Sequence, residues 1–130
     1  MIFVDTSFLI AYAVGRDANH GRANEIRQQE EGETLVLTSH NIEETATFLS
    51  RREGKAKARE IAAKLLTSSE AQVVFPDREL LLKATEVLGS RDGLSLCDAL
   101  AVVVMRELGI RKIASFDSDF DRFPGILRLC

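Results

Sequence analysis

Acidic residues recur along the chain where a predicted strand ends or a predicted helix begins. Asp5 directly follows the apolar run IFV, and Asp117, in the segment SFDSDFD, follows the run KIA. Glu43 and Glu44 fall in the first turns after LVLT, and Asp98 falls in the first turn of an apolar helix. Clustered carboxylates repel one another unless cations neutralise them, and Mg²⁺ and Mn²⁺ prefer such oxygen ligands. The pattern therefore predicts a metal site suited to phosphodiester hydrolysis.

Each of these acids also has a simpler interpretation. Asp5 could be an N-cap or turn aspartate, although a carboxylate after a buried strand is costly without a partner. Asp98 stands in an S-x-x-D pattern that is close to a capping box, which leaves a purely structural role open. Glu43 and Glu44 flank the apolar arc of their helix on opposite sides, so periodicity does not choose between them.

The segment SFDSDFD invites comparison with a calcium loop, because Asp117, Asp119 and Asp121 form a D-x-D-x-D pattern. An EF-hand loop also needs Gly at its sixth position and Glu at its twelfth, where this chain has Arg122 and Arg128. An EF-hand is therefore excluded. We expect Asp117 in the metal site beside its strand, Asp119 as an accessory acid, and Asp121 as a residue that caps or solvates the turn.

Short apolar runs alternate with helical segments along the chain. Strands are predicted at 2–4, 35–38, 72–75, 112–116 and 126–129, and helices at 8–14, 18–30, 41–52, 55–69, 77–90 and 95–108. Thr6 or Ser7 can cap the first helix, and Ser39 or a neighbour can cap the helix at 41–52. The alternation indicates an α/β fold with a parallel sheet of about five strands, because each parallel connection needs a crossover. Sites in such sheets lie beyond the carboxyl ends of the strands.

The length and composition are those of one globular domain spanning residues 1–130. Hydrophobic residues make up 45% of the chain and charged residues 28%, which excludes a disordered protein. The longest apolar run, LAVVVM, is far shorter than the roughly 20 residues that cross a bilayer, so no membrane association is expected. The start of the chain lacks the basic residues of a signal peptide, which predicts a cytoplasmic protein. Cys97 and Cys130 form no zinc or disulfide framework.

Four segments, VDTSFLIAYA, SHNIEETATFL, LSLCDALAVVVMRELGI and IASFDSDFDRFPGI, follow one another over nearly the whole chain. Together they resemble the PIN domain family and, within it, the single-domain VapC-type toxin ribonucleases. The resemblance implies a three-layer α/β/α sandwich. It also implies a metal-dependent endoribonuclease that is the toxin of a type II toxin-antitoxin pair.

The family's acidic quartet, carried over by position, falls on Asp5, Glu44, Asp98 and Asp117, with Asp119 as a frequent additional metal ligand. Glu44 is preferred over Glu43 because the family has its acid just before a T-x-x-x-L stretch, here Thr45 to Leu49. The resemblance further implies Mg²⁺ or Mn²⁺ as cofactor, RNA as substrate and a homodimer. It also implies a cognate antitoxin that inserts a segment into the active-site groove.

Candidate RNA contacts are the cations downstream of Glu44 and the polar residues beside two of the acids. The segment RREGKAKAR is a candidate phosphate-binding surface, although a solvated helix face is an equal alternative. One Tyr and no Trp predict binding through phosphates and RNA shape more than through aromatic stacking. The rival function is a non-catalytic PIN-fold module that binds RNA or protein. The candidate RNA contacts are Thr6, Ser115, Arg51, Arg52 and Lys55.

Overall fold

Five strands form one parallel sheet in the computed structural model of the chain, which describes residues 1–90 and 92–130. The strands are β1 (Ile2–Val4), β2 (Leu35–Thr38), β3 (Ala71–Val74), β4 (Lys112–Ala114) and β5 (Leu127–Leu129). Their order is β3-β2-β1-β4-β5, and each neighbouring pair is parallel. The predicted parallel α/β fold is therefore confirmed.

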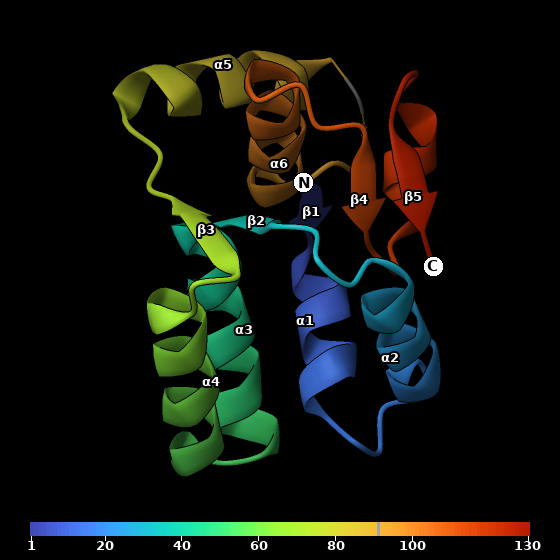
Figure 1. Cartoon of the computed structure of the whole chain (residues 1–130). Coiled ribbons are helices and arrows are strands. Elements are labelled where there is room, and N and C mark those ends of the chain that lie inside the picture. Colours follow the sequence, from blue (N-terminus) through green and yellow to red (C-terminus); the bar gives the residue numbers. More distant parts are fainter. Residues whose placement is uncertain (91) are drawn as a thin grey trace.

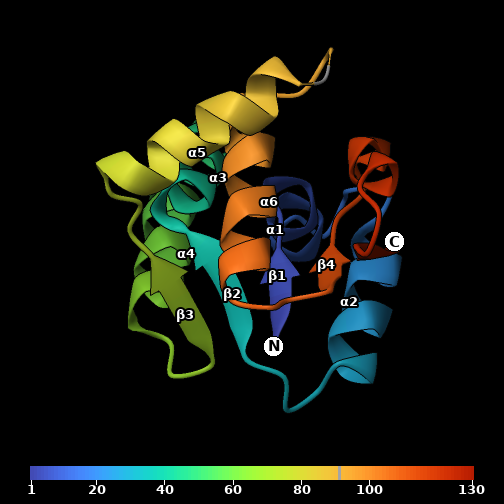
Figure 2. The ribbon, with the colours of Figure 1, turned by 90° about the horizontal axis from the view of Figure 1, so that it is seen from above.

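Helices cover both faces of the sheet and complete a three-layer sandwich (Figure 1, Figure 2). One side carries α1 (Thr6–Ala13), α2 (His20–Gln29), α3 (Ser39–Arg52) and α4 (Lys55–Thr67), and the other carries α5 (Arg78–Gly89) and α6 (Leu96–Glu107). A short 3-10 helix, η1 (Ser118–Arg122), follows β4. Within the described residues, no helix is long and apolar enough to cross a lipid bilayer.

Two hydrophobic cores hold the layers together, because successive side chains of a strand point to opposite faces of the sheet. The core under α5 and α6 receives from the strands Phe3, Val36 and Ile113. The core under α1 and α2 receives Ile2, Val4, Leu37 and Ala114. Helix α6 is buried along the whole run from Ala99 to Met105, which explains why its sequence is apolar almost all round.

The helices that follow β1 and β2 are capped by residues at or directly after the ends of those strands. Asp5 is the N-cap of α1, in place of the predicted Thr6 or Ser7. Thr38, the neighbour of Ser39, is the N-cap of α3. Both caps have extended backbone angles, as an N-cap residue requires, so each helix starts with no intervening loop after its strand.

The order of the strands reverses direction between β1 and β4. From β1 the chain moves outward to β2 and β3, and it then returns to place β4 on the other side of β1. Connections leave such a switch point in opposite directions and open a crevice at the carboxyl ends of the strands. Asp5 follows β1 at this point, and its backbone N–H donates to the Ala114 carbonyl at the end of β4, 3.1 Å away. The topology alone therefore brings the segments of Asp5 and Asp117 together.

Candidate active site

Asp5 is buried at the carboxyl end of β1, with only 7% of its surface exposed. Its Oδ2 atom accepts hydrogen bonds from Ser7 Oγ at 2.6 Å, from Ser115 Oγ at 2.9 Å and from the Ser7 backbone N–H at 3.2 Å. These donors belong to α1 and to the residue after β4, so the carboxylate is held from two segments that are distant in sequence. All three donors are neutral groups, and they leave the negative charge of Asp5 uncancelled.

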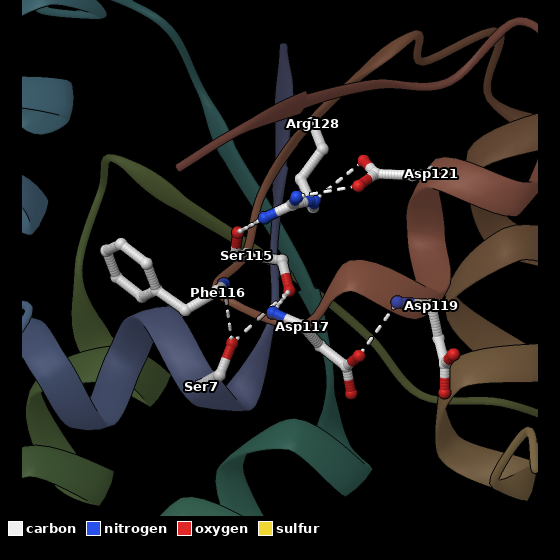
Figure 3. Close-up of polar contacts among 7 residues, drawn as sticks. All are labelled: Ser7, Ser115, Phe116, Asp117, Asp119, Asp121 and Arg128. Carbon is white, nitrogen blue, oxygen red and sulfur yellow. Dashed lines mark hydrogen bonds and ion pairs between the residues drawn. The ribbon is translucent and has the colours of Figure 1, made fainter.

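A pair of serine hydroxyls joins the first and last acidic segments (Figure 3). Ser7 Oγ and Ser115 Oγ lie 3.2 Å apart. The backbone N–H of Phe116 donates to Ser7 Oγ at 3.0 Å, and that of Asp117 donates to Ser115 Oγ at 3.0 Å. Ser115 is completely buried, so its side chain positions the acids and offers no accessible surface for the RNA contact expected of it.

The three aspartates of SFDSDFD have different surroundings. The backbone N–H of Asp119 donates to Asp117 Oδ1 at 2.9 Å, and Figure 3 shows the two side chains pointing to the same side. Asp121 points away from them and forms two bonds of 2.7 Å with the Arg128 guanidinium. This guanidinium holds the pKa of Asp121 below its ordinary value. Asp121 therefore stabilises the turn through an ion pair, and Asp119 forms a second, longer ion pair of 3.3 Å with Arg122.

Asp98 caps α6 and also lies within the electrostatic influence of two other acids. Its Oδ2 atom accepts from Ser95 Oγ at 2.5 Å and from Ser95 N at 3.0 Å, while its own N–H donates to Ser95 Oγ at 3.1 Å. Burial raises the pKa of Asp98 above its ordinary value despite these bonds, and the charges of Asp5 and Asp117 raise it further. The sequence left a capping role and a place among the other acids as alternatives for Asp98. In the structure Asp98 caps α6 and also interacts with Asp5 and Asp117.

The capping box of α6 should contribute measurably to the free energy of unfolding. We expect Ser95→Ala to lower the free energy of unfolding by about 1 kcal/mol, because it removes the N-cap hydroxyl of α6. A loss of that size lowers the melting temperature of a domain of this length by roughly 3–4 °C. Thermal unfolding measures the change, and Ser69→Ala, at an exposed residue outside any helix, is the control. Equal melting temperatures for the two variants would contradict the capping role.

Thr6 distinguishes Glu44 from Glu43. Its Oγ1 atom donates to Glu44 Oε2 at 2.8 Å and accepts from Asn41 Nδ2 at 3.2 Å. Burial raises the pKa of the Cys97 thiol, and the negative charge of Glu44 is the next largest cause, so Glu44 also lies close to the start of α6. The acid preferred from the T-x-x-x-L motif is thus the one bonded to the residue beside Asp5.

The predicted RNA-binding cations lie at the far end of α3 and the start of α4. Arg51 and Arg52 are exposed in the last turn of α3, and Lys55 is exposed in the first turn of α4. At 1.5 Å per residue, Arg51 and Arg52 lie roughly 11–12 Å along the helix axis from Glu44. Arg51 and Arg52 therefore share α3 with Glu44 but lie at its other end, and Lys55 is on the next helix.

The chemistry of the acids fits a hard divalent cation. Every donor is a carboxylate oxygen, and Asp5 and Asp117 raise the pKa of Asp98 as like charges. In residues 1–90 and 92–130, however, no three Asp, Glu, His or Cys side chains converge closely enough to hold an ion. The carboxylates instead face serine hydroxyls and backbone N–H groups. The site has a suitable donor set without a preformed coordination shell.

Two residues that position the acids were not predicted from the sequence. Ser7, which holds Asp5, stands two residues after it, a spacing at which Asp side chains commonly bond their own backbone. Asn41, which donates to Thr6, forms a reciprocal capping box with Thr38. A polar residue three positions after Thr is the signal that could have identified Asn41.

Comparison with protein families matches residues 2–126 to the PIN domain. The chain belongs to the PIN domain family. The match spans the sheet from β1 to β4 and all the acidic segments of this PIN domain, and it confirms the family predicted from the four motifs.

Several named proteins are similar to this PIN domain over nearly their full length. The 23S rRNA-specific endonuclease VapC20 of Mycobacterium tuberculosis is 38% identical over 123 residues, which cover 92% of each chain. Ribonuclease VapC13 of the same species is 31% identical over 140 residues, which cover 99% of each chain. The crystal structure of VapC20, a Sarcin-Ricin loop cleaving toxin, matches with a TM-score of 0.87 at 34% identity over 94% of each chain. A toxin-antitoxin complex from Klebsiella pneumoniae shares the fold, with a TM-score of 0.72 at 14% identity over 98% of this chain and 96% of that one.

Proposed function

We propose that this PIN domain is an endoribonuclease of the VapC type, which hydrolyses phosphodiester bonds in RNA. The observation that carries the proposal is electrostatic: Asp5 and Asp117, which follow β1 and β4 on either side of the switch point, both raise the pKa of Asp98. The relatives named as ribonucleases support the same activity, since one is 38% identical over 92% of the chain.

The cofactor that suits this site is Mg²⁺ or Mn²⁺, because both ions prefer carboxylate oxygens. A divalent ion bound here would polarise a water molecule and the scissile phosphate. The residues that would hold it are Asp5, Glu44, Asp98 and Asp117, with Asp119 as an accessory.

Neutral hydroxyl groups of the chain orient the acids for this task. Ser7 and Ser115 hold Asp5 from two sides, and Thr6 holds Glu44. Such donors fix the carboxylates without cancelling the negative charge that attracts a cation. A lysine or arginine in the same places would compete with the ion.

The activity is expected to depend on a divalent metal. The purified protein should cleave RNA in Mg²⁺ or Mn²⁺, lose cleavage in excess EDTA and regain it when Mn²⁺ is added beyond the chelator. Gel analysis of RNA fragments over time is the measurement. Asp5→Asn, prepared in the same way, controls for contaminating nuclease, because asparagine also caps helices well and leaves the start of α1 intact. RNA cleavage that persists in EDTA would refute the metal dependence.

A non-catalytic module that binds RNA or protein is the second candidate function. The observation in its favour is that no three metal-ligating side chains of the described residues converge to coordination distance. Calorimetric titration with Mn²⁺ separates the two functions. Saturable heat that disappears in Asp5→Asn supports the nuclease, and no heat of binding in the wild type supports the module.

The physiological role proposed for this single domain is that of a toxin held inactive by a cognate antitoxin. The proposal rests on the resemblance of the four ordered motifs to VapC-type toxins and on the identity to VapC20 and VapC13. Purification of the chain together with the product of the neighbouring reading frame would test this pairing.

A homodimer is expected on the same basis. Among the large apolar residues of α1, Phe8 and Leu9 lie in the core, whereas Tyr12 is 43% exposed, stacks on Phe8 and could contribute to an interface. Light scattering at micromolar concentration should therefore give about twice the chain mass of 14.4 kDa. The mass of a single chain under these conditions would refute the dimer.

A further inference from the structure

An open groove of about 740 Å³ lies between α1 and α3, which descend side by side from the sheet (Figure 1). One end of the groove is formed by residues bonded to each other beside the acidic site, Thr6 and Glu44. Its other end is formed by the last turn of α3. Besides Thr6, the groove is lined by two acids, Glu43 and Glu44, by the apolar Ile10 and Phe48, and by Arg51 and Arg52.

The middle of the groove has an apolar floor. Ile10 of α1 and Phe48 of α3 line it, and both pack against a small core formed by Val14, Leu49 and Ala58. Both side chains remain partly exposed. The apolar surface that they offer to a ligand is therefore already held in place by the core beneath it.

The far end of the groove is cationic. The Arg52 guanidinium lies over the Phe48 ring, with its carbon 5.5 Å from the ring centroid. Glu53 is bound mainly by Arg16, at 2.8 Å, and lies 3.9 Å from Arg52, so it compensates the charge of Arg16 more than that of Arg52. Arg51 forms no hydrogen bond or ion pair within residues 1–90 and 92–130. Guanidinium groups bind phosphates in bidentate fashion and stack on the faces of nucleobases.

We propose that this groove binds one unpaired nucleotide of the RNA, adjacent to the bond that is cut. The base lies on Ile10 and on the stacked pair of Phe48 and Arg52, and the phosphate of the same nucleotide meets Arg51. The proposal rests on the proposed function, since the acidic end of the groove is the Glu44 side of the active site. A base can reach the floor only when it is unpaired and unstacked, so the site selects single-stranded or looped RNA.

An RNA occupant explains the arrangement of charge along the groove. The carboxylates stand at the end where a divalent ion would bind, and the arginines stand roughly 11–12 Å farther along α3. A polyanion that runs along the groove would therefore meet cations at both ends and an apolar surface between them. The volume is also within the range of about 300–1,000 Å³ that is typical of small-molecule sites.

Mononucleotides test the groove without any cleavage, because they contain no internucleotide bond. In Mg²⁺, titration of the full chain with 5′-AMP should shift the NMR signals of the Ile10 methyl groups and the Phe48 ring in a saturable way. Ribose 5-phosphate, which lacks the base, should bind about tenfold more weakly, in line with the worth of one stacked base. Phe48→Leu should remove this preference for the nucleotide over the sugar phosphate.

Two arginine variants show whether the phosphate binds Arg51 specifically or only responds to the positive charge of the protein. Arg51→Gln should weaken both ligands several-fold, whereas Arg59→Gln, which removes an exposed charge of α4 outside the groove, should not. Thermal unfolding of each variant shows whether the fold is kept.

Three results would overturn the proposal. They are equal affinity for ribose 5-phosphate and 5′-AMP, no shift at Ile10 and Phe48 with either ligand, and equal effects of the two arginine substitutions. A stronger shift with the acidic peptide acetyl-Leu-Glu-Leu-Glu-amide than with 5′-AMP would also overturn it, and would identify the groove as a protein-docking surface. Because none of these readouts requires cleavage, a failed nuclease assay and a failed groove assay are distinguishable.

Discussion

Asp98→Asn is expected to lower the rate of RNA cleavage by about a thousandfold while leaving the fold at least as stable as the wild type. The loss follows from removing one of the carboxylates proposed to hold the divalent ion. The stability follows from the pKa of Asp98, which burial raises first and which Asp5 and Asp117 raise further. An amide in this place escapes both the burial of charge and the repulsion, and its oxygen still accepts from Ser95.

The gain in stability of Asp98→Asn over the wild type should increase as the pH rises. Because the pKa of Asp98 is higher in the folded than in the unfolded chain, ionisation favours unfolding. The contribution of the protonated acid to stability is complete below the unfolded pKa and is lost as the pH rises through the folded pKa. Asp98→Asn should therefore gain more over the wild type at neutral pH than at acid pH, as measured by urea unfolding at both.

Asp77→Asn is the matched control, because Asp77 is also the N-cap of a helix, α5, but is exposed and is not among the acids proposed to hold the ion. Asparagine caps helices as well as aspartate does, so this variant should keep both its stability and its activity. Full activity in Asp98→Asn would remove Asp98 from the site. A loss of stability in that variant at neutral pH would instead show that the capping bonds outweigh the charge repulsion.

The predicted positions of Asp5 and Asp117 depended on strong local signals. Each follows a short apolar run, and the alternation of such runs with helices specifies a parallel sheet whose strands end at one edge. The alternation of apolar runs with helices can be recognised in a single sequence, because it repeats along the chain. The three-layer fold and the bounds of most elements could be predicted for the same reason.

Side chains whose role depends on a distant partner could not be placed in this way. Periodicity left Glu43 and Glu44 equivalent and the family motif favoured Glu44, whose bond with Thr6 joins residues 38 positions apart. Asp121 was expected only to cap or solvate its turn, because its partner Arg128 comes within reach only after β5 returns beside β4. The groove is a third case, since Ile10 and Phe48 become neighbours only through the packing of α1 on α3.

The second large effect is expected from a residue between the acids of SFDSDFD. Phe120 is completely buried and is the side chain that fixes η1 to the core containing Phe3 and Ile113. Phe120→Ala should cost about 3–5 kcal/mol of the free energy of unfolding, measured in urea. It should also lower cleavage in the folded protein by up to about a hundredfold, because η1 carries Asp119 and follows Asp117, and small displacements of catalytic groups have effects of that size.

A matched core substitution separates loss of position from loss of stability. Ile26→Ala creates a cavity in the opposite core, under α2, and should cost a comparable 2–5 kcal/mol. At a temperature where both variants are folded, Ile26→Ala should cleave RNA at the wild-type rate and Phe120→Ala should not. Equal rates in the two variants would show that η1 holds its acids without Phe120, in which case the ion pair of Asp121 with Arg128 alone would be sufficient to position them.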